Sequence, residues 1–299
     1  MNLIVWLILC LIWGSTWIFI KVGLADLPPI TFEAARFMLA VAVLLPVIRI
    51  QKHAFPRNAD QWKLIALTGF LQFSVNYSLV FWSEQYITSG LASVLQAMIT
   101  VFGLVLAWLF LPSERITPLK VIAVFTGIGG VAVIFFDQLR IENYMAFLGS
   151  VGIVVGAYAA AQASILVKAK AAGIPPASLV CAQMICGLPA IIIYALSVEG
   201  NPINHNWSMR AIGCVLYLSL VGTVAAFWLY YWLLSRIEST KAMMISLVTP
   251  LLAVVIGAVT IGETMPAQTV AGGLLIIGSI GMIVFRRRQK ALPEPATAG

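Results

Sequence analysis

The chain has 299 residues, of which 61% are hydrophobic and 10% charged, and its mean hydropathy is +1.00. Water-soluble domains carry about 25% charged residues, so the composition excludes a soluble enzyme. The net charge of +7 comes from Lys and Arg residues that stand between apolar runs rather than along one face. This pattern indicates membrane topology rather than nucleic-acid binding.

Ten apolar runs follow one another, separated by charged residues or by Pro and Gly. Each is close to the ~20 residues that a membrane-spanning helix requires, and a β-barrel is not expected because the runs do not alternate. The first run lacks a basic leader and a small-residue cleavage site, so we expect a span and not a signal peptide. The predicted spans are 3–20, 30–48, 64–82, 91–111 and 118–136 in the first half, and 144–167, 177–198, 212–234, 242–261 and 269–285 in the second.

The basic residues are distributed unevenly between the connections. With a cytoplasmic N-terminus, fourteen of the eighteen Lys and Arg residues fall in inner connections or the C-terminal tail, and Arg36 lies within a span. Only Lys21, Arg140 and Arg210 fall outside. Short loops obey the positive-inside rule, so we expect a multi-pass protein of the cell inner (plasma) membrane with both termini in the cytoplasm.

The two halves of the sequence resemble each other. Three patterns recur. Lys21 with Leu27-Pro28-Pro29 matches Lys168 with Ile174-Pro175-Pro176 at an offset of 147 residues. Ile87-x-Ser89-x-x-Ala92 matches Ile237-x-Ser239-x-x-Ala242 at an offset of 150, and Glu114 and Gly129 match Glu263 and Gly278 at an offset of 149. Because a five-helix unit has an odd number of spans, its second copy enters the membrane from the opposite side. The sequence therefore predicts an inverted repeat, which is typical of alternating-access transporters.

Several motifs carry a family resemblance. Ile12-Trp13-Gly14-Ser15-Thr16, Lys21-Val22-Gly23-Leu24, Leu27-Pro28-Pro29 and the Arg36-Phe37 pair resemble the first two helices of EamA-type members of the drug/metabolite transporter superfamily, and the resemblance extends through Glu114 and Glu263 over nearly the whole chain. It implies an all-α integral membrane fold of ten helices in two inverted EamA repeats. It also implies a central cavity lined by helices 1, 3, 4, 6, 8 and 9, and export of amino acids or related metabolites.

Polar side chains near span centres are candidates for the cavity, because polar groups at bilayer depth tend to face the protein interior. Gln72 and Asn76 share a helix face, as do Tyr158 and Gln162. These faces could hydrogen-bond an amino-acid headgroup while aromatic rings pack against an apolar side chain. Hydrogen bonding between helices is the structural alternative. The predicted substrate-binding residues are Trp13, Gln72, Asn76, Gln96, Tyr158, Gln162 and Trp228.

Glu33 and Arg36 are opposite charges within one span, spaced so that they can pair on one helix face. We predict a structural ion pair or a gate latch rather than a substrate ligand. At the offset of 147 residues between Lys21 and Lys168, Arg36 aligns with Gln183, and Glu33 aligns with Val180. The charged pair is therefore absent from the second copy.

Two further pairs of charges lie at equivalent helix ends. Lys21 and Lys168 are expected to anchor at the membrane surface, or alternatively to screen access to the cavity and favour an anionic group. Glu114 and Glu263 precede the fifth and tenth spans, and we expect them to cap the N-termini of those helices.

The sequence thus predicts a secondary transporter of a small polar or amphipathic metabolite. The alternatives are a nucleotide-sugar or sugar-phosphate exchanger of the same superfamily, which requires more basic groups in the cavity, and an intramembrane enzyme or structural membrane subunit. No cofactor, metal, nucleic-acid partner or catalytic residue is expected; the expected partners are the small-molecule substrate and the lipid bilayer. The expected divisions are residues 1–140 and 141–288 for the two repeats and 289–299 for a disordered cytoplasmic tail.

Overall fold

The computed structural model describes residues 1–56, 58–87, 89–114, 116–134, 136, 143–252 and 267–284. This part of the chain is helical and contains no strand. Three predicted features lie outside the described residues: the tail, residues 253–261 of the ninth span, and Glu263. The predicted all-α fold is confirmed.

Six helical segments are long and apolar enough to cross a membrane, and four shorter apolar helices accompany them in the described residues. The long segments are α1 (Asn2–Gly23), α2 (Pro29–Ile50), Ala59–Ser83, α8 (Tyr144–Lys170), Pro176–Glu199 and Met209–Leu234. The shorter helices include α6 (Met98–Phe110), which follows α5 (Ser89–Gln96), α7 (Pro118–Ile134), α12 (Ser239–Met243) within Ser239–Leu252, and α14 (Ala267–Val284). Helices predominate because hydrocarbon offers no partner for unpaired backbone groups.

The inverted repeat is visible in the local backbone as well as in the sequence. The third span is α3 (Ala59–Gly69), the π-helical η1 (Phe70–Asn76) and α4 (Tyr77–Ser83). The eighth is α10 (Met209–Ser219), the π-helical η5 (Leu220–Ala225) and α11 (Ala226–Leu234). The two π segments begin at Phe70 and Leu220, which are 150 residues apart, as are Ile87 and Ile237. Such segments are rare and occur frequently at functional sites.

Prolines begin the second helix of each repeat in the same way. Pro29 opens α2 and Pro176 opens α9 (Pro176–Tyr194), which continues into η3 (Ala195–Glu199). Proline suits the first helical position because the N–H it lacks has no partner there. The repeated Pro-Pro pairs thus mark the same structural event in both halves.

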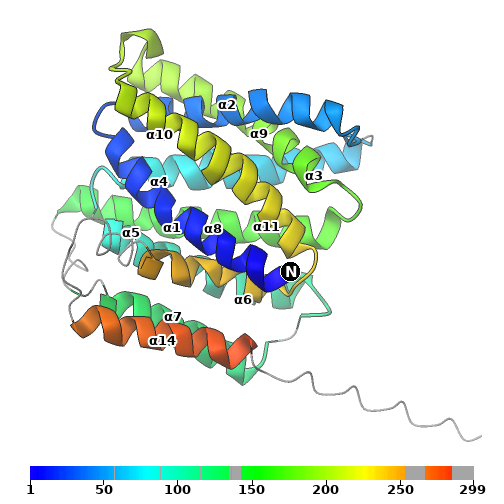
Figure 1. Cartoon of the computed structure of the whole chain (residues 1–299), viewed down its shortest axis with the longest axis vertical. Helices are drawn as coiled ribbons and strands as arrows, with labels where there is room; N and C mark the ends of the chain where they lie inside the picture. Colours follow the sequence, from blue (N-terminus) through cyan, green and yellow to red (C-terminus); the bar gives the residue numbers. More distant parts are fainter. Residues whose placement is uncertain are drawn as a thin grey trace, which may run out of the picture.

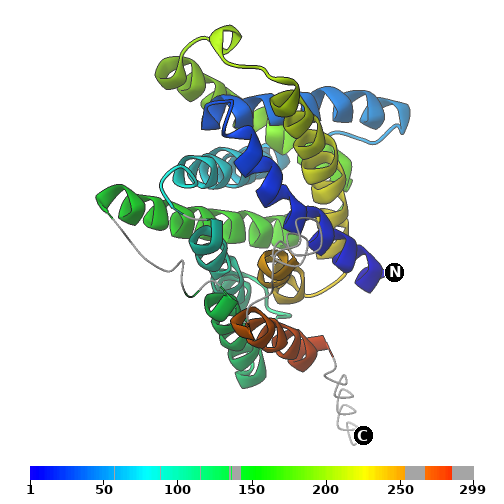
Figure 2. The same ribbon diagram turned by 60° about the vertical axis from the view of Figure 1, so that its left-hand side comes forward.

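The helices form a bundle with one separate pair at its edge. Figures 1 and 2 both show α7 and α14 side by side, away from α2, α9 and α10. Gly130 and Gly272 let these two helices approach closely, since a Cβ on Gly272 would lie 2.5 Å from the Gly130 carbonyl oxygen. We call the end of the bundle at which α1 begins and α8 ends the N-terminal face, and the other end the distal face (Figure 1).

Candidate functional site

A central pocket lies between the helices that the resemblance implied, namely spans 1, 3, 4, 6, 8 and 9. Its polar lining residues are Thr16, Gln72, Asn76, Gln96, Ser164, Ser246 and Thr249, and its aromatic ones are Trp13, Trp17, Tyr77, Phe227 and Tyr230. None of the described residues that line it is charged. The pocket therefore offers hydrogen-bonding groups on one hand and flat apolar surfaces on the other.

The amide side of the pocket is built on the π-helical segment η1. Gln72 and Asn76 both belong to this segment and are buried. The amide nitrogen of Gln96 donates to Asn76 Oδ1 at 3.3 Å, whereas the buried Oε1 of Gln96 has no hydrogen-bond partner among the described residues. An amide can make up to four hydrogen bonds, so this group retains unused capacity where a ligand would lie.

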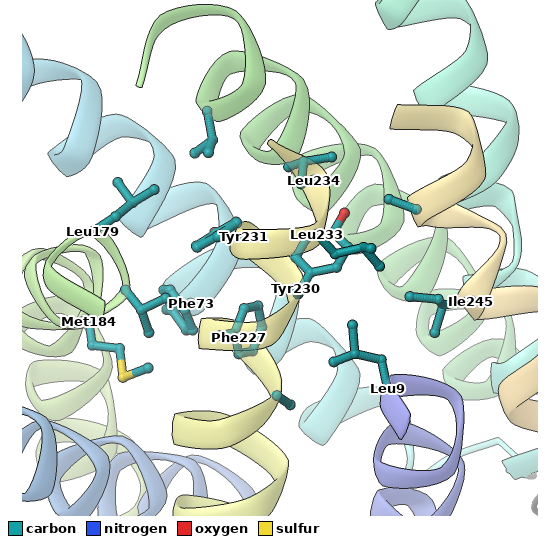
Figure 3. Close-up of a cluster of buried hydrophobic side chains, with 14 of the residues drawn as sticks. Leu9, Phe73, Leu179, Met184, Phe227, Tyr230, Tyr231, Leu233, Leu234 and Ile245 are labelled. Atoms are coloured by element: carbon teal, nitrogen blue, oxygen red, sulfur yellow. The ribbon is translucent and has the colours of Figure 1, made fainter. Parts of the chain in front are cut away.

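The aromatic side comes from α1 and α11. The ring of Trp13 lies 5.5 Å from Phe227 and 5.2 Å from Tyr230, measured between centroids. The Tyr230 hydroxyl donates to Ser164 Oγ at 3.2 Å, while the buried indole N–H of Trp13 has no hydrogen-bond partner in the part of the chain that the structure describes. Figure 3 shows Phe227 and Tyr230 continuing into a buried cluster with Phe73 and Ile245. Packing thus fixes these rings before a ligand arrives.

The structure separates the predicted binding residues into two groups. Trp13, Gln72, Asn76 and Gln96 line the pocket; Tyr158, Gln162 and Trp228 are not among the described lining residues. Tyr158 is 47% exposed and its ring contacts Phe102 at 5.5 Å on the outside of the bundle. Gln162 keeps a buried, unpartnered Oε1, and Trp228 lies 6.4 Å from the ring of His53.

Glu33 and Arg36 are both fully buried, but no ion pair within 4 Å joins them in the described part of the chain. Ser78 Oγ donates to Glu33 at 2.8 Å. Arg36 donates through Nε to Thr223 Oγ1 at 2.7 Å and lies 4.8 Å above the Tyr77 ring. The expected direct pair is thus replaced by separate contacts with neighbouring helices, because Ser78 of α4 binds Glu33 and Thr223 of η5 binds Arg36.

A network of charged and polar groups joins helix ends at the N-terminal face. The Glu114 carboxylate accepts hydrogen bonds from the backbone N–H of Ser239 at 2.9 Å and from its hydroxyl at 2.6 Å. Lys168 Nζ lies 3.3 Å from the same carboxylate and also donates to the carbonyls of Leu234 and Ile237. These contacts join the helix ends of both repeats.

This network corrects the expectation for Glu114. It caps the N-terminus of α12, in the ninth span, and not the helix that follows it in sequence. The N–H groups at the start of α12 attract a carboxylate from another helix as well as a local one. Lys168 likewise binds protein groups instead of extending to the membrane surface.

At the distal face, polar groups that sequence analysis did not single out tie the helices together. Asp26 accepts from Arg210 Nε at 2.9 Å and Nη2 at 2.7 Å and from Ser208 Oγ at 2.6 Å. The hydrogen bonds from Arg210 and Ser208 lower the pKa of Asp26 to about 2. Glu199 caps α2 by accepting from the N–H groups of Ile30 and Thr31. Only the loop position of these residues hinted at such a role.

Comparison with known proteins agrees with this architecture. The model of the EamA-like transporter family matches residues 1–136 and 147–285. The "Uncharacterized transporter YoaV" of Bacillus subtilis (strain 168) is 25% identical over 275 residues, which cover 92% of this chain and 94% of that protein. The "Uncharacterized inner membrane transporter YedA" of Escherichia coli (strain K12) is 26% identical over 292 residues, covering 95% and 92%.

A solved structure described as "Crystal structure of protein" has the same fold. It matches with a TM-score of 0.80 at 14% sequence identity, over 95% of this chain and 96% of that one. At this level of identity the match shows the arrangement of the helices and nothing about the substrate.

Proposed function

Because the chain belongs to the EamA-like transporter family, which is part of the drug/metabolite transporter superfamily, we propose that it exports amino acids or related small amphipathic metabolites across the inner membrane. Transport would proceed by alternating access and without a catalytic step. The named relatives are transporters, which supports the general class. The substrate and the direction belong to the proposal.

The observation that carries the proposal is the composition of the pocket. Amide groups of Gln72, Asn76 and Gln96 face aromatic rings of Trp13 and Phe227 across one cavity. A zwitterionic amino acid has no net charge, so it does not require a full counter-charge in the lining. Its ammonium and carboxylate groups can bind amides and hydroxyls while its side chain packs on the rings. This arrangement favours amphipathic over strongly charged substrates.

Alternating access is supported by the difference between the two faces. Lys168, Glu114 and Ser239 link helix ends at the N-terminal face, whereas Trp17, Ile20 and Val80 line the pocket on its distal side. We assign the N-terminal face to the cytoplasm on the basic residues of its loops. The repeats, with their boundary between residues 140 and 141, would then exchange roles in the opposite state.

A nucleotide-sugar or sugar-phosphate exchanger is the second candidate within the superfamily. Phosphate groups are bound by Arg and Lys, and the described lining contains neither. The pocket therefore favours the amino-acid class. Radiolabelled panels that include both kinds of compound separate the two candidates directly.

The test is transport by the purified protein in liposomes, with leucine, methionine, phenylalanine and tryptophan as probes and a sugar phosphate for comparison. We expect uptake of at least one amino acid. Asn76→Ala and Gln96→Ala should weaken its binding by about 1–3 kcal/mol, or about 5- to 150-fold. Gln85→Ala, which removes an exposed amide outside the pocket, should transport normally.

Thermal stability distinguishes a binding role from helix packing. For a binding role, the midpoint of Asn76→Ala without substrate stays near that of the wild type, and the rise caused by substrate is lost. A lowered midpoint with an intact rise would assign Asn76 to packing. Uptake of the sugar phosphate alone would overturn the proposed substrate class.

A further inference from the structure

A buried carboxyl group, that of Glu84, lies four residues beyond the lining residue Val80 of the central pocket. Val80 of α4 lines the pocket there together with Trp17 and Ile20 of α1. Glu84 follows Val80 by four residues, at the C-terminal end of α4, and Lys21 follows Ile20 on α1. Residues four apart share a helix face, so Glu84 lies on the face that carries Val80, one turn beyond the pocket lining.

The Glu84 carboxylate forms no close contact with a positive charge: no ion pair within 4 Å involves it in the described part of the chain. The side chain is 7% exposed, and neither carboxylate oxygen has a hydrogen-bond partner among the described residues. A buried, unpartnered polar group is costly, and more so when it is charged. A proton would remove that charge without any rearrangement of the helices.

We propose, on the basis of the transport function above, that Glu84 is a proton-binding residue at the mouth of the pocket and makes transport respond to the proton concentration at the distal face. Burial raises the pKa of Glu84 to about 8, and the nearby charge of Lys21 offsets part of that rise. The carboxyl group therefore gains and loses its proton within the range of ordinary external pH.

Lys21 is the charged side chain that acts on Glu84 from the neighbouring helix α1, and it makes no ion pair within 4 Å among the described residues. In the turn that follows α4, the adjacent polar groups are Gln85, whose amide donates to the Trp82 carbonyl, and Tyr86, whose ring packs on Trp82. Leu91 of α5 and Ile153 of α8 pack in the hydrophobic cluster that contains Val80.

The consequence for gating follows from the two charges. When Glu84 is ionised it attracts Lys21 across the mouth of the pocket, between α4 and α1, and this attraction opposes opening. When Glu84 is protonated the attraction is lost. Transport should therefore accelerate as the distal pH falls through about 8.

The second repeat shows that the fold does not require a carboxyl group at this position. At the offset of 150 between Ile87 and Ile237, Glu84 aligns with Leu234, which is 1% exposed. An apolar side chain packs at the equivalent helix end on the N-terminal face. The titratable group is thus specific to the distal mouth, as a sensor of one compartment would be.

The first experiment needs no substrate. Dicyclohexylcarbodiimide modifies protonated carboxyl groups in apolar surroundings, and mass spectrometry of the labelled peptide distinguishes Glu84 from Glu33. We expect labelling of Glu84 in the full-length protein to decline with a midpoint near pH 8. Lys21→Met should move that midpoint to higher pH, because the charge that favours ionisation is gone. Absence of labelling, or a midpoint below pH 6, would overturn the proposal.

The second experiment measures transport of whichever amino acid the panel identifies, with the distal pH varied from 7 to 9. The protonated fraction of a group with a pKa near 8 falls about tenfold over this range, and the wild-type rate should fall with it. Glu84→Gln and Glu84→Leu should keep the rate of the acidic plateau at every pH, and Lys21→Met should also lose the alkaline decline. Persistent pH dependence in both Glu84 variants would overturn the proposal.

Sodium provides the remaining control. If 100 mM NaCl protects Glu84 from labelling and equimolar choline chloride does not, the site binds sodium and the proton proposal is wrong. If no compound in the panel is transported, the proposed function fails, but the labelling experiment still decides whether Glu84 binds a proton.

Discussion

Replacing Arg36 by Met tests how the buried charges are stabilised. Arg36 is 1% exposed and makes hydrogen bonds to Thr223 Oγ1 at 2.7 Å and the Gly222 carbonyl at 3.2 Å. Hydrogen bonds of charged groups contribute about 1.5–3 kcal/mol each, and the change also leaves Glu33 without a nearby positive charge. We expect Arg36→Met to lower the free energy of unfolding by about 3–6 kcal/mol, the contribution of the two hydrogen bonds that are lost.

The double variant tests whether the two charges are coupled despite lacking direct contact. Glu33→Gln removes the second charge and retains an amide oxygen that can accept from Ser78. If the field of Arg36 stabilises Glu33, then Arg36→Met combined with Glu33→Gln should be less unstable than the sum of the single variants by at least about 1 kcal/mol.

The assay is reversible unfolding by SDS in mixed micelles, followed by circular dichroism. Arg49→Met is the matched control, since Arg49 lies on the same helix and is exposed; its effect should stay within about 0.5 kcal/mol. The reasoning is refuted if Arg36→Met and Arg49→Met differ by less than 1 kcal/mol. Additive effects of the double variant would show that the charges are independent.

Three further outcomes are expected. Gly69→Ala should cost about 1–3 kcal/mol of stability, because its Cβ would lie 2.9 Å from the carbonyl carbon of Gln183, while Gly129→Ala, with nothing within 4 Å, should be neutral in the same SDS titration. A fluorescent protein fused after Gly299 should fluoresce in the cytoplasm; activity of a periplasm-only reporter there would contradict the proposed orientation. The wild type should be more stable than Asp26→Asn by a constant amount from pH 8 to 5, and this difference should shrink as the pH falls below about 4 towards 2. The reason is that the pKa of Asp26 is lowered from 3.8 to about 2. A difference that vanishes above pH 5 would refute the link to Arg210.

The spans and the repeat could be predicted because both depend on patterns that the membrane imposes directly. Runs of about 20 apolar residues must form helices to satisfy their backbone, and Pro-Pro pairs begin helices wherever they occur in the chain. The π segments could not be predicted. Phe70–Asn76 and Leu220–Ala225 read as ordinary helix, since their sequences contain no proline or charge that marks a change in hydrogen bonding.

The sequence predicts part of the pocket lining, where polar residues lie near the middle of a span. Gln72 and Asn76 lie at mid-span and line the pocket. Tyr158 also lies at mid-span, but its ring packs on Phe102 at the outside of the bundle, an orientation that spacing alone does not determine. The sequence does not mark Glu84 as buried, because this residue follows the apolar run; only the packing of α4 shows its burial.

The equivalent positions of the two repeats explain why the site is asymmetric although the scaffold is repeated. At the offset of 150, Gln72 aligns with Gly222, Asn76 with Ala226 and Glu84 with Leu234, so these three polar residues of the first copy have small or apolar counterparts in the second. The exchange is structural as well as chemical. A Cβ at Gly222 would lie 2.9 Å from Thr16 Cγ2 and 3.5 Å from Arg36 Nη2, so η5 surrounds the buried Arg36 where η1 presents amides to the pocket. In the proposed mechanism, the repeated scaffold would supply the two conformations, and the differences between its copies would supply the substrate contacts.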